Sequence, residues 1–364
     1  MSVATADPVR SDVPFDLRRG SLRLLTTAAN AVGIQAPVAG VSFLPALMAG
    51  IVGTAGPLSF AVATVAMLFV AYAFVTFTRA FNSAGSVYAF NGRALGRAVG
   101  FVSVWLLVAV YLSYAASVYA SNANALRALL ALGESGSAGG GIPIVAFLTA
   151  HWIVLAVGCW ALTIAIAHRS VRTASTVILA CEGVALILVA AVAAAVVLHG
   201  GYHHHGLSKV PLVPGAPGLA VLGLGVVFAF TGFSGFEVAA TLGEEARLPV
   251  RVVPASMVAA LLLSGGVYTV MAWVEAGAFS SPAAFAASAA HGVPLVLIAQ
   301  RFAGPPLAIL VLVAAIISGF GAQLACINGA TRLLYALGRD RVAPHRLAMV
   351  GARYGTPTKA LAVV

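Results

Sequence analysis

The chain has 364 residues, of which 61% are hydrophobic and 8% are charged, and its mean hydropathy is +1.02. Soluble globular domains carry about a quarter charged residues, so this composition excludes an ordinary soluble enzyme or binding domain. The net charge of +10 is explained by the placement of basic residues around membrane spans, and it predicts no nucleic-acid partner.

Apolar runs long enough for the ~20-residue crossing of a lipid bilayer recur along the whole sequence. They predict eight spans, at about 24–54, 57–79, 98–131, 143–167, 173–199, 217–245, 252–276 and 305–337. A ninth run begins in TPTKALAVV, where the sequence stops. We therefore expect a polytopic all-α membrane protein, and we expect the chain to be a fragment that is truncated near the start of helix 9.

The segments between the spans predict the orientation of the chain. Residues 1–23 form a polar tail without the apolar core of a signal peptide. Residues 133–143 read as a flexible outer loop and 278–304 as short helices over the outer face. With the tail inside, the inner segments hold all but three of the 20 basic residues, the exceptions being Arg127, Lys209 and Arg301. Since basic residues concentrate on the cytoplasmic side, we predict a cytoplasmic N-terminus in the cytoplasmic membrane.

The sixth span contains an unusual interruption. TGFSG (231–235) places two glycines and two hydroxyl residues in five positions, and Glu237 follows inside the apolar run. Small residues in a membrane helix often serve close packing alone. A dense cluster beside a carboxylate instead favours unwound backbone, which is tolerated at membrane depth only where protein or water satisfies it.

The first span carries a matching interruption. NAVGIQAPVAGVSFLP (30–45) holds Asn30, Gly33, Gln35, Pro37 and Gly40, and the proline removes a backbone donor. Helices 1 and 6 lie five spans apart, so they occupy corresponding positions in two five-helix halves of inverted topology. This pattern is typical of secondary transporters with a site near the bilayer midplane.

Three further motifs show a family resemblance. They are FSGFEVAATLGEEARLP (233–249), NSAGSVYAFNGRALG (82–96) and NGATRLLYALGRDRVAPHRLAMVGARYGTPTKA (328–360). Together they resemble the amino acid–polyamine–organocation (APC) superfamily of permeases. That resemblance implies a LeuT-like 5+5 inverted-repeat fold, with residues 24–215 as the first repeat and 216–364 as an incomplete second repeat. In helix 1 the family usually has Gly-x-Gly, whereas this chain has Val38 at the first position and Gly40 at the second.

The resemblance also implies a substrate site at the two interruptions. In helix 6, carbonyl groups near Phe233 and Ser234 would bind the amine of a substrate. In helix 1, backbone N–H groups would bind its carboxylate, if it has one. The expected substrate-binding residues are Pro37, Val38, Ala39, Gly40, Val41, Thr231, Phe233, Ser234 and Gly235.

Two carboxylates are predicted to lie at membrane depth. Of ten acidic residues, only Glu182 and Glu237 fall deep within spans, because Glu275 lies near the outer end of helix 7 and Glu244 and Glu245 lie at the cytoplasmic end of helix 6. Placing an ionisable group in a membrane costs free energy, so such a group is a functional candidate. We expect Glu182 and Glu237 each either to couple transport to protons or to be a protonated structural residue. Phe236 is expected either to gate the site or to pack in the core or against lipid.

Other polar residues carry weaker signals. Tyr111, Tyr114, Gln323 and Asn328 need partners inside the bundle, in roles that stay open. HGGYHHHG (199–206) is better explained as a solvated outer loop than as a metal site, because consecutive histidines do not all face one ion. The three cysteines lack disulfide or metal spacing.

The sequence thus predicts a permease that moves an amino acid or related amine by alternating access, driven by protons or exchange. A polyamine or organic cation permease of the same fold is the first alternative, and a channel is a weaker one. We find no enzyme, phosphate-loop or cofactor motif, so neither catalysis nor a cofactor is expected.

Overall fold

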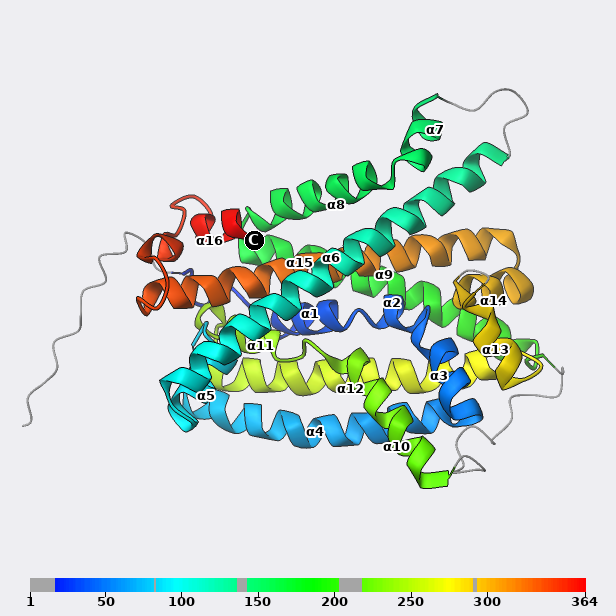
Figure 1. Cartoon of the computed structure of the whole chain (residues 1–364), viewed down its shortest axis with the longest axis horizontal. Helices are drawn as coiled ribbons and strands as arrows, with labels where there is room; N and C mark the ends of the chain where they lie inside the picture. The colour runs from blue at the N-terminus through cyan, green and yellow to red at the C-terminus, as the bar shows by residue number, and fades with distance from the viewer. Residues whose placement is uncertain (1–16, 82, 136–142, 203–217, 291–292) are drawn as a thin grey trace, which may run out of the picture.

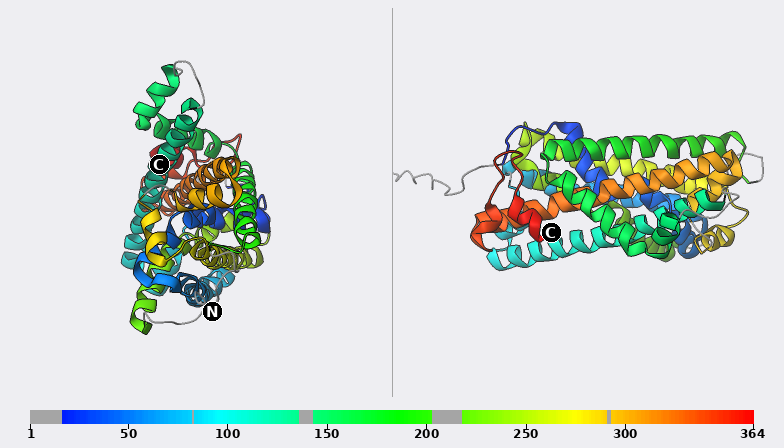
Figure 2. Two further views of the ribbon diagram at one scale, coloured as in Figure 1. Left: turned by 90° about the vertical axis from the view of Figure 1, so that its right-hand side faces the viewer. Right: turned by 90° about the horizontal axis from the view of Figure 1, so that it is seen from above.

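The computed structural model describes residues 17–81, 83–135, 143–202, 218–290 and 293–364. Within these ranges the regular structure is helical apart from one isolated β-bridge, between Leu22 and Ala246. The longest helices run side by side along the long axis of the molecule (Figures 1 and 2). They are α4 (Gly56–Ala80), α6 (Arg97–Ser135), α9 (Val171–Leu198), α12 (Pro249–Gly277) and α15 (Pro305–Arg339).

In the described part of the chain, seven segments are long and apolar enough to span a membrane. The predicted first span is divided into α1 (Leu24–Gln35), α2 (Pro37–Val41) and α3 (Leu44–Val52), and the sixth into α10 (Gly218–Ala229), a 3₁₀ turn η3 (Phe230–Phe233) and α11 (Val238–Thr241). The predicted fourth span, 143–167, is divided at His151 into α7 (Pro143–Ala150) and α8 (Trp152–Ala167).

Shorter elements connect these spans. The short helices expected in 278–304 are present as α13 (Pro282–Ser288) and α14 (Pro294–Ala303). The connecting elements are η1 (Gly53–Ala55), α5 (Val87–Ala94), η4 (Gly243–Glu245), α13 (Pro282–Ser288), α14 (Pro294–Ala303), η5 (His345–Ala348) and α16 (Thr358–Val363). Residues 203–206 of the histidine-rich stretch singled out in the sequence lie outside the described residues.

The interrupted helix α1 lies at the centre of the bundle, in contact with α9, α12 and α15 (Figure 1). Gly33 permits this close approach, because a Cβ atom there would come within 2.7 Å of Ile178 on α9 and 3.2 Å of Ala325 on α15. Residues 29–35 of α1 are all buried as a result. The core therefore surrounds the same helix that carries the first interruption.

The outward faces of the long helices are strongly apolar. Phe69 and Tyr72 on α4 are 76% and 72% exposed, and Leu106 on α6 is 63% exposed. An apolar belt of this extent is unfavourable in water and is suited to contact with lipid chains. The chain is therefore a multi-pass membrane protein, as its composition predicted.

One end of the bundle brings together the segments 17–23, 83–97, 168–172, 242–251 and 338–359, which we call the basic end. Leu22 donates its N–H to the carbonyl of Glu245 over 3.1 Å. Arg18 Nη2 donates to the carbonyl of Arg353 at 2.8 Å, and Thr356 Oγ1 donates to that of Arg169 at 2.7 Å. The short helices α7, α13 and α14 lie at the opposite end (Figure 1). The grouping of loops that the sequence predicted is thus confirmed.

Candidate functional site

The first interruption lies between α1 and α2. Ala36 has a left-handed backbone with φ of 40°, which ends α1, and Pro37 begins α2 at a position where its missing N–H costs no hydrogen bond. The carbonyl of Gln35 accepts a hydrogen bond from the hydroxyl of Tyr268 on α12, at 2.9 Å. Gly40 lies against the same tyrosine, and a Cβ atom there would overlap its hydroxyl. The break is therefore built around Tyr268.

The second interruption lies between η3 and α11. Thr231 and Phe233 belong to the 3₁₀ turn, whereas residues 234–237 form turns, so the break extends two residues beyond the predicted TGFSG. Gly235 has a φ of 98°, and a Cβ atom there would overlap the side chain of Ile34 on α1. Glycine is thus required both by the left-handed backbone at this position and by the close packing against Ile34.

Glu237 stabilises the unwound turn. Its Oε2 accepts the N–H of Gly235 at 3.1 Å, and its Oε1 accepts the hydroxyl of Tyr111 on α6 at 2.9 Å. Phe236 is 4% exposed and packs edge-on against Phe74 of α4, with ring centroids 5.2 Å apart. Phe236 does not line the central cavity described below.

One side chain joins the two interruptions. Gln35, which is 3% exposed, donates from Nε2 to the carbonyl of Phe233 at 3.3 Å. Its Oε1 accepts the hydroxyl of Ser264 on α12 at 2.7 Å. Tyr268 completes the group, stacked on Phe60 at 5.0 Å and edge-on to Phe233 at 5.8 Å. The end of α1 is thus tied both to η3 and to α12.

A cavity of about 770 Å³ lies beside the two interruptions, toward the end of the bundle opposite the basic end. Its volume is within the usual range for small-molecule sites. Of the predicted substrate-binding residues, Ala39, Gly40 and Thr231 line it, whereas Pro37, Val38, Val41, Phe233, Ser234 and Gly235 do not.

The described lining of this cavity is neutral. Its polar side chains are amides and hydroxyls, none of them charged; they are Gln35, Tyr114, Ser117, Ser121, Asn122, Asn124, Thr231 and Tyr268. Its larger apolar side chains are Phe43, Leu44, Val118, Val293 and Leu312. Such a lining accommodates an apolar group and offers hydrogen bonds, without an ionic partner for a second charge.

Glu182 connects the first interruption with two long helices. It lies on α9, is 3% exposed, and has its Oε1 3.0 Å from the hydroxyl of Ser318 on α15. The same hydroxyl oxygen accepts the N–H of Ala39 at 3.3 Å. A carboxylate, a hydroxyl and an amide of the broken helix thus form a chain of hydrogen bonds from α9 through α15 to α2.

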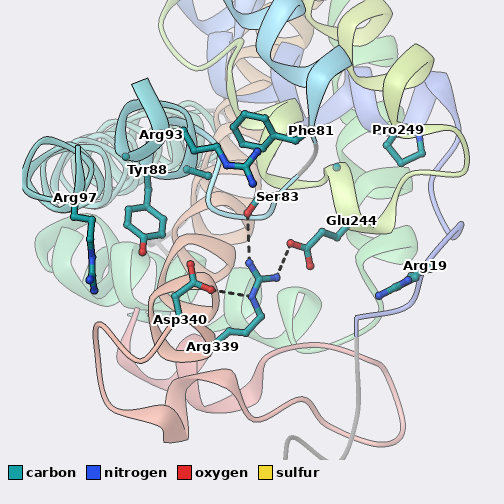
Figure 3. A pocket seen from close by; sticks show the side chains of 13 residues that line it. Arg19, Phe81, Ser83, Tyr88, Arg93, Arg97, Glu244, Pro249, Arg339 and Asp340 are labelled. Carbon is teal, nitrogen blue, oxygen red and sulfur yellow. Dashed lines mark hydrogen bonds and ion pairs between the residues drawn. The ribbon is translucent and has the colours of Figure 1, made fainter. Parts of the chain in front are cut away.

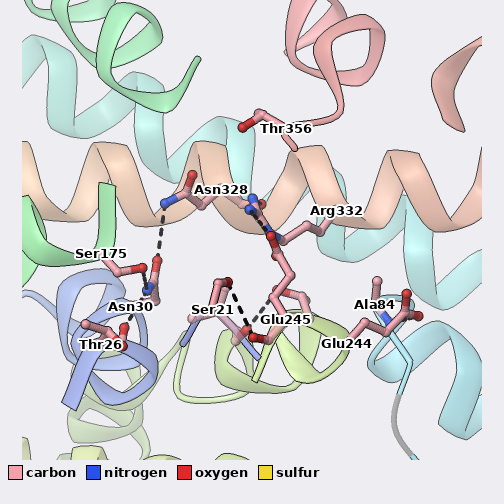
Figure 4. A network of polar contacts seen from close by, with 12 residues as sticks. Ser21, Thr26, Asn30, Ala84, Ser175, Glu244, Glu245, Asn328, Arg332 and Thr356 are labelled. Atoms are coloured by element: carbon pink, nitrogen blue, oxygen red, sulfur yellow. Dashed lines mark hydrogen bonds and ion pairs between the residues drawn. The ribbon is translucent and has the colours of Figure 1, made fainter. Parts of the chain in front are cut away.

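Polar contacts connect the basic end with α15, α1 and α9 (Figure 4). Glu245 and Arg332 are each 1% exposed and form an ion pair with Nε and Oε2 2.6 Å apart. Arg332 also donates to the carbonyl of Asn328 at 3.0 Å, and Asn328 donates to Asn30 on α1 at 3.2 Å. Glu245 lies at the end of helix 6, in η4, where the sequence placed it, and α15 supplies it with a buried partner.

A second ion pair lies nearer the surface (Figure 3). Arg339 Nη1 is 2.6 Å from Glu244 Oε1, and Arg339 Nε is 3.2 Å from Asp340 Oδ1. Glu244 Oε1 also accepts the N–H of Ala84 at 2.8 Å. Partial burial and the nearby Asp340 raise the pKa of Tyr88, which lines the same hollow, so its phenol stays neutral at physiological pH.

Glu275 is a further buried carboxylate. It lies near the end of α12, where the sequence placed it, and it is 0% exposed. Among the described residues, neither of its carboxylate oxygens has a hydrogen-bond partner. Its position close to the end of an apolar run concealed this burial, because the covering residues come from other parts of the chain.

Comparison with known proteins identifies the family. A family model described as amino acid permease matches residues 22–364. The chain belongs to the amino acid permease family. This confirms the APC resemblance of the three motifs.

Relatives in this family are named for different substrates. The branched-chain amino acid permease BcaP of Bacillus subtilis is 26% identical over 321 residues, which cover 84% of this chain and 64% of that protein. BcaP of Lactococcus lactis is 25% identical over 318 residues, covering 82% and 64%. The low-affinity putrescine importer PlaP of Escherichia coli is 25% identical over 305 residues, covering 79% and 60%. The chain spans less than two thirds of the length of these relatives.

The sequence analysis did not assign three members of the candidate site. Tyr268 was not singled out, since a tyrosine in an apolar span is common. Gln35 was noted only as a polar residue of helix 1, and Ser318 only as part of helix 8. A hydrogen-bonding side chain within a span was the available signal for each, because buried polar groups need partners.

Proposed function

We propose that this protein is a secondary transporter that moves an amino acid with an apolar side chain across the cytoplasmic membrane by alternating access. The observation that carries the proposal is the meeting of two interrupted helices beside a neutral cavity of about 770 Å³. Interrupted membrane helices expose backbone groups that bind the polar ends of a solute.

The proposed substrate contacts follow from the backbone groups at the breaks that make no helical hydrogen bond. The carbonyls of Phe233 and Ser234 bind the amine. The amides of α2 bind the carboxylate, and Ala39 is the foremost donor because it lines the cavity and its N–H makes only a 3.3 Å bond to Ser318. The N–H of Gly40 is already bonded to the carbonyl of Ala36 at 2.8 Å.

The neutral lining favours an amino acid over a polyamine. A diamine has a second ammonium group, which needs a carboxylate when it leaves water. The described lining has none, and its apolar side chains instead suit an aliphatic group. A channel is disfavoured because the ion pair of Glu245 and Arg332 is buried, with each side chain 1% exposed, and does not line an open polar path.

We propose that protons drive the transport through Glu182 and Glu237. Each carboxylate contacts an interrupted helix, Glu182 through Ser318 and Glu237 directly. Loss or gain of a proton changes the hydrogen bonds that these groups offer, and so biases the position of α2 or α11. The basic end, with the N-terminal tail, faces the cytoplasm, in keeping with the positive-inside rule.

Uptake into proteoliposomes tests the proposal. The full-length protein is reconstituted, and uptake of labelled leucine, valine, alanine, glutamate, lysine and putrescine is measured with and without an inward proton gradient. We expect saturable leucine or valine uptake that the gradient increases. Saturable putrescine uptake that excess leucine does not inhibit would contradict the proposed substrate class.

A further inference from the structure

We propose that Gln35 is a built-in competitor of the substrate: its side-chain amide occupies the Phe233 carbonyl while the site is empty. This inference rests on the proposed function and concerns the same site. It adds a residue that regulates access of the substrate amine to its carbonyl partner.

The Phe233 carbonyl is available because the helix is broken. Within the described chain it accepts no backbone hydrogen bond, since residues 234–237 turn away from the helical path. Phe233 is 0% exposed, and a buried carbonyl without a partner is costly. The Nε2 of Gln35 supplies the missing donor at 3.3 Å.

Gln35 also lies between this carbonyl and the cavity. Gln35 lines the cavity, whereas Phe233 does not. A ligand that enters the cavity therefore reaches the Phe233 carbonyl only after the amide of Gln35 has moved. The substrate and the side chain thus use the same acceptor.

The arrangement allows exchange because the bond is weak and its donor is anchored elsewhere. Hydrogen bonds of this type are usually about 2.9–3.0 Å long, so the 3.3 Å contact is a poor one. An ammonium group forms hydrogen bonds that are roughly twice as strong as those of a neutral amide. The displaced side chain keeps Ser264, which donates to its Oε1 at 2.7 Å, and its backbone carbonyl keeps Tyr268 at 2.9 Å.

The test compares ligand affinity in variants of the purified full-length protein. Gln35→Met keeps the length of the side chain and removes the donor, so it should lower the leucine Kd by about threefold to tenfold, the range expected when one neutral hydrogen bond no longer competes. Ser264→Ala loosens the anchor of Gln35 and should change the Kd in the same direction. Gln323→Met replaces another buried glutamine, outside the cavity lining, and should leave the Kd unchanged.

A second ligand tests whether the effect of Gln35→Met depends on the amino group of the substrate. 4-Methylpentanoate is leucine without its amino group, so Gln35→Met should not change its affinity. Weaker leucine binding in Gln35→Met, or an equal gain for both ligands, would overturn the inference.

The inference and the proposed function fail in different ways. If the wild-type protein binds leucine and Gln35→Met binds it with the same Kd, only the role of Gln35 is wrong. If the wild-type protein binds none of the apolar amino acids, the proposed substrate class is wrong.

Discussion

Glu245 and Arg332 form an ion pair inside the bundle, with Oε2 and Nε 2.6 Å apart and each side chain 1% exposed. Glu245 belongs to η4, in the basic end, and Arg332 belongs to the last third of α15. Their contact holds η4 against α15 on the proposed cytoplasmic side of the bundle. With that orientation, the structure represents a state whose cavity lies on the outer side.

Removal of one partner of this pair should destabilise the fold more than removal of both. Arg332→Met leaves a buried carboxylate alone and should destabilise the fold by about 3–5 kcal/mol, whereas Glu245→Met with Arg332→Met should recover most of the loss. Thermal unfolding of the purified variants measures this difference. A double variant that is as unstable as the single one would show that the pair is not the coupled unit described above.

Gly235→Ala should weaken both folding and leucine binding. The left-handed backbone costs an alanine about 1–2 kcal/mol, and overlap with Ile34 adds about 1–3 kcal/mol. Gly223→Ala on α10 is the matched control, since no atom lies within 4 Å of its Cβ position. Unfolding temperature and leucine Kd are the two measurements. Equal behaviour of the two variants would contradict the packing of helix 6 against α1.

Glu237→Gln should reduce proton-driven uptake more than it reduces binding. The variant keeps the size of the side chain but loses the titratable group, so its uptake should depend less on external pH. Wild-type uptake should rise as external pH falls, because protonation precedes inward movement. Glu182→Gln is measured in parallel.

The comparison of these two variants assigns the coupling residue. A flat pH profile in only one of them identifies the carboxylate that carries the proton. Wild-type profiles in both would remove proton coupling through these residues from the proposal.

Glu275→Met should stabilise the protein. A buried polar group without a partner costs about 1–3 kcal/mol, and a methionine of similar length removes that cost while filling the same space. An increase in the unfolding temperature is expected. A clear decrease would reveal that the Glu275 carboxyl has a stabilising partner.

Thiol labelling tests the orientation. In a background with the three native cysteines replaced by alanine, Ala303→Cys at the end of α14 should react with an impermeant reagent added outside intact cells. Arg169→Cys and His345→Cys, both at the basic end and exposed, should react only after the cells are opened. The reverse pattern would place the N-terminus outside.

Local chemistry made the two helix breaks predictable. Pro37 has no backbone N–H, and Gly235 adopts a left-handed backbone that other residues rarely reach, so both positions disturb a helix whatever surrounds them. The apolar spans and the basic end were predictable for the same reason, because lipid and water select residue types segment by segment. The division into two inverted repeats stays a prediction.

The partners of the polar residues were decided by the tertiary structure alone. Gln35 meets Phe233, which is 198 positions away, and Glu245 meets Arg332 across 87 positions. Glu275 is buried although it lies near the end of its helix. A polar side chain in a membrane span signals by its type that it needs a partner, but which partner it finds depends on the rotation and packing of helices that are distant in the chain.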